Sequence, residues 1–224
     1  MKKPIAIIPA RGGSKRLARK NILPLGDIPL IAHIISSTIE SKVFSRVIVS
    51  TEDKEISKIA SDYGAEVFQR NTALAQDTST VVEVCLDILK DIDDDLFCCL
   101  YATAALLSKE TIRISYQRFV EEESNVLMGV SSYNYSPVQA LMVNDSGVAS
   151  LLLKEFEDSQ SQSHSKFRVS NGTFFWAKKK SFMKEKTFYP SSLRVLDVQE
   201  QEVCDIDTIE DYLILQKKYE ASHI

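Results

Sequence analysis

Apolar residues along the first half of this chain alternate between short continuous runs and stretches with helical spacing. A continuous run such as Leu96–Tyr101 is typical of a strand buried on both faces of a parallel sheet. Ser79–Lys90 instead carries apolar residues at helical spacing, and Ser108 is placed as a helix N-cap. The predicted strands are Ile5–Ile8, Arg46–Ser50, Ala65–Phe68 and Leu96–Tyr101, and the predicted helices are Pro29–Glu40, Asp53–Tyr63, Ser79–Lys90 and a segment from Ser108. This alternation predicts an α/β fold in three layers, with helices on both faces of a mostly parallel, twisted sheet.

The pattern changes after Asn125. Pro137–Asn144 and Val148–Leu153 predict a two-stranded pair, because Asp145-Ser146-Gly147 between them is typical of a turn. The polar segment Glu155–Arg168 predicts a loop. Further strands are predicted at Asn125–Ser131, Phe174–Trp176 and Arg194–Val198, and a last helix at Thr208–Tyr219. We therefore expect a single domain over residues 1–224, with an insertion at about 135–172 that projects from the sheet.

Composition narrows the class of ligand and the compartment. Over 224 residues the net charge is −4, which argues against a broad basic face for nucleic acid. No apolar run approaches the ~20 residues of a membrane helix, and the apolar stretch after Met-Lys-Lys is shorter than the core of a signal peptide. The four cysteines form no Cys-x-x-Cys pair and histidine is scarce, which argues against zinc, while Cys98 and Cys99 lie in an apolar run that predicts buried thiols. We expect a cytoplasmic protein that binds neither nucleic acid nor membrane.

The loop after the first predicted strand carries the strongest chemical signal. It holds two glycines and five cations: Gly12, Gly13, Arg11, Lys15, Arg16, Arg19 and Lys20. Glycine lets the backbone approach an anion, and the cations neutralise phosphate oxygens, so the loop predicts a polyphosphate site. The alternative is a solvated basic loop. The loop matches neither the Gly-x-Gly-x-x-Gly dinucleotide pattern nor the P-loop pattern, which argues against a Rossmann dehydrogenase.

Asp205 and Asp207 form the second candidate group. They lie two residues apart, so in an extended segment their side chains share a face and suit a hard cation such as Mg²⁺. The alternative is that both carboxylates only cap the helix whose start Thr208 and Asp211 mark. The polyphosphate loop favours Mg²⁺, because nucleoside triphosphates are handled with this ion.

Weaker signals lie at the ends of other predicted strands. Arg70 follows the third strand, where open α/β sheets bind ligands; the alternative there is a plain loop capped by Asp77-Thr78-Ser79. Leu100–Ala104 ends another strand. Gln139 in the insertion is either a hydrogen-bonding partner for a substrate or ordinary surface.

These residues together resemble a known family. Ile8-Pro-Ala-Arg-Gly-Gly-Ser-Lys-Arg-Leu-x-x-Lys-Asn21 is similar to the signature of the CMP-sialic acid synthetases, the cytidylyltransferases that activate sialic acids and related nine-carbon sugar acids. Arg46–Asp53, Tyr63–Glu66 and Asp205–Thr208 recur at the family's positions, while Tyr101–Ala104, Pro137–Leu141 and Phe174–Trp176 most resemble the pseudaminic acid branch. The resemblance implies a Rossmann-like nucleotide-diphospho-sugar transferase fold. It also implies a reaction in which CTP and a nonulosonic acid give CMP-sugar and pyrophosphate, with Mg²⁺ as cofactor.

The resemblance also implies roles for individual residues. The catalytic residues would be Arg11, Lys20 and Asp207, and Mg²⁺ would lie on Asp205 and Asp207. CTP would lie against Arg11, Gly12, Gly13, Ser14, Lys15, Asn21, Arg70, Ala75, Thr78 and Ser79, and the sugar acid against Tyr101, Thr103 and Gln139. The insertion would pack against a second subunit in a homodimer.

Two stretches on the sugar side depart from the family's pattern. Ala105-Leu106 stands where a proline is common, and Gln160–Ser163 lacks an expected arginine and aspartate. N-acetylneuraminate, legionaminate and Kdo therefore stay open as alternative sugars, as does a CTP-binding homologue with weak catalysis.

Overall fold

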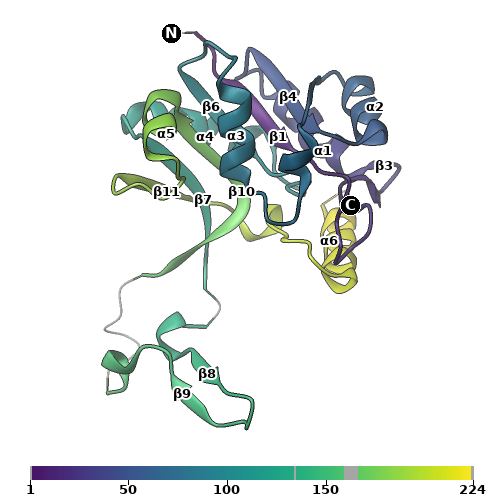
Figure 1. Ribbon diagram of the computed structural model, residues 1–224. Coiled ribbons are helices and arrows are strands. Elements are labelled where there is room, and N and C mark those ends of the chain that lie inside the picture. The colour runs from purple at the N-terminus through teal and green to yellow at the C-terminus, as the bar shows by residue number, and fades with distance from the viewer. Residues whose placement is uncertain (1, 134, 159–165, 223–224) are drawn as a thin grey trace.

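A twisted sheet of seven strands forms the centre of the computed structural model, which describes residues 2–133, 135–158 and 166–222 (Figure 1). The strand order is β11-β7-β10-β6-β1-β4-β5. The strands are β1 (Ile5–Pro9), β4 (Arg46–Thr51), β5 (Glu66–Gln69), β6 (Leu96–Leu100), β7 (Val126–Ser132), β10 (Arg168–Lys178) and β11 (Leu193–Asp197). Only β10 among these described strands runs antiparallel to its neighbours, β6 and β7. The prediction of a mostly parallel sheet is confirmed.

Helices cover both faces of this sheet. They are α1 (Leu30–Glu40), α2 (Lys54–Asp62), α3 (Val81–Leu89), α4 (Lys109–Glu121), α5 (Lys179–Glu185) and α6 (Ile209–Ala221). One buried cluster joins Ile34 of α1 and Phe119 of α4 to Trp176, and a second joins Ile88 of α3 and Phe182 of α5 to Phe97. Because side chains of successive strand residues point to opposite faces, each face has its own core, and the three predicted layers are confirmed.

Local sequence explains where the helices begin. Thr80 with Glu83 and Thr208 with Asp211 each form a capping box, in which the threonine oxygen accepts the N3 backbone N–H and the acid accepts the N-cap N–H. The predicted cap Asp77-Thr78-Ser79 is therefore wrong by one to three residues. Glu83 lies three residues after Thr80, so the capping box forms at Thr80 and α3 starts at Val81.

The segment between β7 and β10 extends away from the sheet as an arm, which we define as residues 135–158 (Figure 1). It contains a short antiparallel pair, β8 (Leu141–Val143) and β9 (Ala149–Leu151). Six of its large hydrophobic side chains are more than half exposed: Tyr135, Leu141, Met142, Val143, Val148 and Leu152. β10 takes in the end of the predicted insertion, because its residues from Arg168 pair with the end of β7. Residues 159–165, which include all of Gln160–Ser163, lie outside the described residues.

The apolar runs of the sequence form the buried core of the domain. Cys98 and Cys99 are buried free thiols, as their position in an apolar run predicts; Cys85 is also buried, and Cys204 is half-buried. In the part of the chain that the structure describes, no helix combines the length and apolar character needed to span a membrane.

Candidate active site

A cavity of about 400 Å³ opens at the carboxyl ends of β1 and β6. Open α/β sheets bind their ligands at this edge. The polar residues that line the cavity come from four segments of the chain: Arg11, Arg16, Lys20, Asn21, Arg70, Asp77, Ser79, Thr80, Tyr101, Thr103, Asp205 and Asp207. The fold thus gathers the cation-rich loop after β1, the segment before α3, the end of β6 and the segment before α6 around one space.

Asp77 binds two cations of the loop after β1. The Arg11 Nη1 atom lies 2.7 Å from Asp77 Oδ1, and the Lys15 ammonium contacts the other carboxylate oxygen. Hydrogen bonds from Lys15 and Arg11 hold the pKa of the Asp77 carboxyl below its ordinary value, so the group is ionised at neutral pH. The pairing joins the loop after β1 to the segment before α3 at the cavity.

Asp207 binds two further cations of the same loop. The Arg16 Nη1 atom lies 2.6 Å from Asp207 Oδ2, and Lys20 Nζ donates to Asp207 Oδ1 at 3.2 Å. Lys20 Nζ also donates to the carbonyl oxygen of Ile206 at 2.5 Å. Four of the five predicted loop cations are therefore held by two carboxylates that line the cavity.

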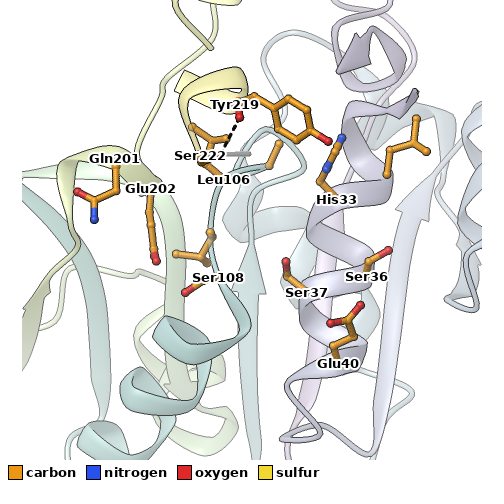
Figure 2. A pocket seen from close by; sticks show the side chains of 13 residues that line it. His33, Ser36, Ser37, Glu40, Leu106, Ser108, Gln201, Glu202, Tyr219 and Ser222 are labelled. Atoms are coloured by element: carbon orange, nitrogen blue, oxygen red, sulfur yellow. Dashed lines mark hydrogen bonds between the residues drawn. The ribbon is translucent and has the colours of Figure 1, made fainter. Parts of the chain in front are cut away.

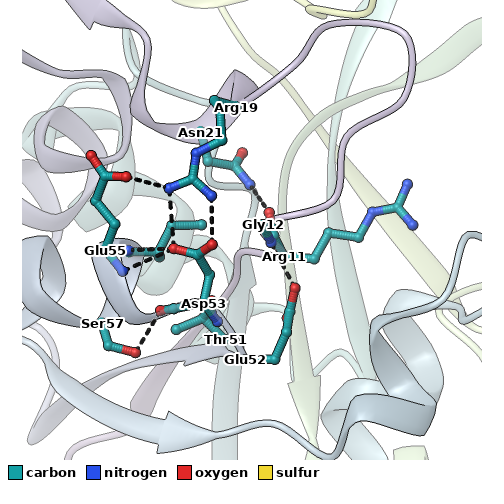
Figure 3. Close-up of polar contacts among 10 residues, drawn as sticks. Arg11, Gly12, Arg19, Asn21, Thr51, Glu52, Asp53, Glu55 and Ser57 are labelled. Atoms are coloured by element: carbon teal, nitrogen blue, oxygen red, sulfur yellow. Dashed lines mark hydrogen bonds and ion pairs between the residues drawn. The ribbon is translucent and has the colours of Figure 1, made fainter.

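The fifth cation, Arg19, belongs to the support of the loop (Figure 3). Its guanidinium bonds Asp53 at 2.5 and 3.2 Å and Glu55 at 2.6 Å. The hydrogen bonds that Arg19 donates to Asp53 raise the pKa of Arg19 above its ordinary value. Arg19 also has a φ of 57°, a left-handed conformation that turns the chain at this point. These contacts fix the loop to the start of α2.

The backbone of the loop is held from two sides (Figure 3). The Gly12 N–H donates to Glu52 Oε1 at 2.8 Å, and Asn21 Nδ2 donates to the Arg11 carbonyl at 3.0 Å. A Cβ atom at Gly12 would lie 2.5 Å from Asp53 Oδ2, whereas one at Gly13 would meet nothing described within 4 Å. Position 12 therefore requires glycine because its backbone lies against Asp53, whereas position 13 has room for a side chain.

We expect Gly12→Ala to lower the free energy of unfolding by about 1–3 kcal/mol, since an added methyl group must displace the Asp53 side chain or the loop. Gly13→Ala is the matched control, because its methyl group would enter open space. Urea denaturation of the two variants measures the difference. Equal midpoints for the two variants would contradict the close packing of Gly12 on Asp53.

Arg70 is the most buried cation of the cavity, with 5% of its surface exposed. Its guanidinium donates to the Ser50 carbonyl at 2.7 Å and to Ser50 Oγ at 3.2 Å. Burial lowers the pKa of Arg70 below its ordinary value, and the nearby Glu52 carboxylate acts in the opposite direction. An arginine remains charged under these conditions, so Arg70 presents a fixed positive charge. Burial also raises the pKa of the Tyr101 hydroxyl, which therefore stays neutral and able to donate a hydrogen bond.

The structure brings most of the predicted site residues together. Those that line the cavity are Arg11, Lys20, Asn21, Arg70, Ser79, Tyr101, Thr103, Asp205 and Asp207. Gly12, Gly13, Ser14 and Lys15 flank it in the same loop, and Ala75 and Thr78 lie in the segment before α3. Gln139 lies exposed in the arm and is not among the described residues around the cavity.

The sequence places Arg16 among the loop cations and Asp77 in the stretch near the nucleotide, but it predicts no individual site role for either residue. Both line the cavity and pair with oppositely charged residues of distant segments. Their place in the sequence carried a signal, since Arg16 lies between Lys15 and Lys20 and Asp77 lies between Ala75 and Thr78. The missing information was the pairing, which joins positions more than 60 residues apart.

Asp205 and Asp207 suit an Mg²⁺ ion that is coordinated by both protein and phosphate oxygens. Within the described residues, no group of three or more His, Cys, Asp or Glu side chains is arranged to hold a metal ion. Mg²⁺ is commonly bound by one or two carboxylates, with phosphate oxygens and water completing its octahedron. Asp205 and Asp207, on the wall of a cavity rich in cations, match that donor set.

A second cavity, of about 380 Å³, lies between α1, the loop before α4 and the end of α6 (Figure 2). His33, Glu40, Ser108, Glu202 and Tyr219 are among the residues around it. None of the described residues lining it is a lysine or arginine. A polyphosphate needs cations, so the cavity beside the loop after β1 is the candidate active site.

Comparisons with known proteins agree with this geometry. A family model described as cytidylyltransferase matches residues 5–218. The pseudaminic acid cytidylyltransferase of Campylobacter jejuni serotype O:2 is 33% identical over 227 residues, covering 99% of this chain and 98% of that protein. The CMP-N,N'-diacetyllegionaminic acid synthase of Legionella pneumophila is 32% identical over 97% of both chains.

A solved structure shares the fold. CMP:2-keto-3-deoxy-manno-octonic acid synthetase complexed with CTP matches the whole of both chains with a TM-score of 0.76 and 14% identity. This likeness confirms the nucleotidyltransferase fold that the sequence resemblance implies. Since the family model and the Campylobacter jejuni relative both cover nearly the whole chain, the protein belongs to the cytidylyltransferase family.

Proposed function

We propose that this cytidylyltransferase transfers CMP from CTP to pseudaminic acid and releases pyrophosphate. The observation that carries the proposal is the gathering of Arg11, Arg16, Lys20 and Arg70 around one cavity with Asp205 and Asp207. The cations suit the charge of a triphosphate, and the two carboxylates suit the Mg²⁺ that accompanies it.

The proposed reaction is an in-line displacement at the α-phosphorus of CTP. The anomeric oxygen of the sugar acid forms a bond to this phosphorus, the bond to the β-phosphate oxygen breaks, and pyrophosphate leaves with the negative charge. The anomeric proton passes to solvent. Such reactions depend on positioning and on neutralising charge more than on covalent chemistry, and the paired cations of the loop after β1 are placed to do both.

Mg²⁺ would be held by Asp205 and Asp207. When bound, the ion lowers the pKa of a coordinated hydroxyl and neutralises charge on phosphate oxygens. The chain's own contribution is to orient Asp207, through the bonds from Arg16 at 2.6 Å and Lys20 at 3.2 Å. Lys20 is itself fixed by its bond to the carbonyl oxygen of Ile206, the residue between Asp205 and Asp207.

Pseudaminic acid is the preferred acceptor for two reasons. Its cytidylyltransferase from Campylobacter jejuni matches this chain over nearly its full length, and Tyr101–Ala104 at the cavity resembles that branch. The legionaminate relative is almost as similar, at 32% identity, so the acceptor is a matter for direct assay.

A panel of sugar acids with CTP and Mg²⁺ tests the proposal. Pseudaminic, legionaminic and N-acetylneuraminic acids and Kdo would each be assayed for pyrophosphate release, with the product identified by mass. We expect the highest kcat/KM with pseudaminic acid. A higher value with another acid would replace the acceptor, while CTP binding without turnover of any acid would support a binding protein instead of an enzyme.

We further propose that the arm packs against a second copy of the chain. A two-stranded pair is marginally stable alone, and the arm exposes Leu141, Val143 and Val148 more than half. Contact with a second copy would remove this apolar surface from water. A homodimer follows from the proposal.

The double substitution Leu141→Asp/Val143→Asp tests the dimer, because it puts two charges on the arm where apolar side chains are exposed. We expect the mass measured by light scattering to fall from that of a dimer to that of one chain. Ile114→Asp is the matched control, since Ile114 is 57% exposed on α4. A single-chain mass for the unaltered protein at micromolar concentration would refute the proposal.

A further inference from the structure

The Asp77 carboxylate pairs with two cations that a triphosphate would also use. Asp77 lines the candidate active site, and its carboxylate binds both Arg11 and Lys15. Guanidinium and ammonium groups bind carboxylate and phosphate oxygens with the same donors, so each donor that faces Asp77 is withheld from a phosphate. A carboxylate at this place therefore competes with the triphosphate for two cations of the loop after β1.

The segment that carries Asp77 is tied down on both sides. The backbone N–H of Ser79 donates to the Gln76 carbonyl at 3.1 Å, and Ser79 Oγ donates to the Ala73 carbonyl at 3.2 Å. Directly after it, Thr80 and Glu83 form the capping box of α3. These bonds hold the backbone at Asp77 against the cavity, so its negative charge stays near any phosphate that displaces it from Arg11 and Lys15.

The other cavity carboxylates differ from Asp77 in one respect, although Asp207 also binds two cations of the loop after β1. Asp205 and Asp207 lie two residues apart and form the pair that suits Mg²⁺, which would compensate their charge. Asp77 lies in a different segment of the chain, directly before α3. Among the described ion pairs, its carboxylate contacts Arg11 and Lys15 alone. Its charge is compensated only by the cations that phosphate oxygens would also take.

We propose that Asp77 is a positioning residue that limits the affinity of the site for phosphate and so favours release of pyrophosphate. The proposal rests on the proposed function, because it requires that the loop after β1 binds the triphosphate. Asp77 repels the bound anion in substrate and product alike, and after each turnover its carboxylate returns to Arg11 and Lys15 as pyrophosphate leaves. The lower affinity for pyrophosphate limits inhibition of the site by this product.

The substitution Asp77→Asn tests the proposal by calorimetric titration without sugar acid, so that no turnover occurs. We expect both CTP and inorganic pyrophosphate, each with Mg²⁺, to bind about three- to tenfold more tightly, as loss of one partly exposed competing charge allows. The gain should shrink as salt is raised. Asp87→Asn is the matched control, because it removes the same charge from α3, where Asp87 pairs with Lys90 at 3.2 Å; it should change neither affinity.

Comparison of CTP with pyrophosphate distinguishes the possible explanations of a change in affinity. Equal tightening of CTP and pyrophosphate supports competition for phosphate. Unchanged or weaker binding of either ligand to the Asp77→Asn variant would overturn the inference, and weaker binding of CTP alone would mean that Asp77 contacts the nucleoside. Failure of the unaltered protein to bind CTP or pyrophosphate would refute the proposed function itself, and that result is distinct because it needs no variant. In steady-state assays the variant should show a lower KM for CTP and stronger inhibition by pyrophosphate, which a merely structural residue would not produce.

Discussion

Asp207→Ala should lower the rate of pyrophosphate release roughly a hundred- to a thousandfold, the range found when one group that stabilises charge in a transition state is removed. The substitution removes the carboxylate that binds Arg16 and Lys20 and leaves Asp205 without its neighbour on the cavity wall. The remaining single carboxylate is a poorer partner for Mg²⁺. Initial rates with CTP, Mg²⁺ and sugar acid at saturation measure the effect.

The fold should survive this change. The backbone N–H of Asp207 donates to Asp211 Oδ2 at 3.0 Å, and the capping box of α6 is built by Thr208 and Asp211, so neither contact needs the Asp207 side chain. We expect thermal unfolding to stay close to that of the unaltered protein, while the rise in Tm that CTP and Mg²⁺ produce is reduced. Asp62→Ala, which breaks a pair with Lys58 on α2, is the matched control. Near-normal turnover of the Asp207→Ala variant would remove the Mg²⁺ assignment.

The parallel core of the fold could be predicted because its signals are local. Leu96–Leu100 is a continuous apolar run and four of its five residues are fully buried in the structure, as expected of a strand covered by helices on both faces. Thr208 and Asp211 mark the start of α6 by a spacing of three residues. Each of these signals is contained in one short stretch of sequence.

Elements that depend on distant partners could not be predicted. α5 has the charged sequence Lys-Lys-Ser-Phe-Met-Lys-Glu, and its buried residue, Phe182, is held by Phe97 of β6 and by Phe188. The antiparallel direction of β10 follows from the path of the chain through the arm and back to β7 and β6. The β2–β3 pair (Pro24–Leu25 and Ile28–Pro29) has two residues per strand and leaves no periodic pattern.

The candidate site shows the same division. The loop after β1 was recognisable from its glycines and cations, but its sequence does not say which cation faces the cavity. Arg16 turns toward Asp207, whereas Arg19 turns toward Asp53, 34 positions further along the chain. The choice is made by side chains of other segments and by the left-handed backbone at Arg19. The kind of ligand was therefore predictable, and the arrangement of the cations was not.

Lys20→Ala should reduce kcat/KM roughly ten- to a thousandfold, which corresponds to about 1.4–4 kcal/mol of lost transition-state stabilisation. The Lys20 ammonium donates to the Ile206 carbonyl at 2.5 Å and to Asp207 Oδ1 at 3.2 Å, so it both supplies charge to the cavity and orients Asp207. Lys58→Ala, whose ammonium pairs with Asp62 on the surface of α2, is the control and should be close to the unaltered protein. An unchanged rate for the Lys20→Ala variant would make Lys20 a surface residue without a role in the reaction.

A double-mutant cycle between Lys20 and Asp207 separates the two roles of the lysine. If Lys20 acts only by orienting Asp207, the Lys20→Ala/Asp207→Ala variant should be no slower than Asp207→Ala alone, because the carboxylate to be oriented is gone. If the ammonium also binds phosphate oxygens, the second substitution should still weaken CTP binding, and the loss should be larger at low salt than at high salt. We expect the second result, since Lys20 lines the cavity with 20% of its side chain exposed and an ammonium can donate up to three hydrogen bonds, of which two are used.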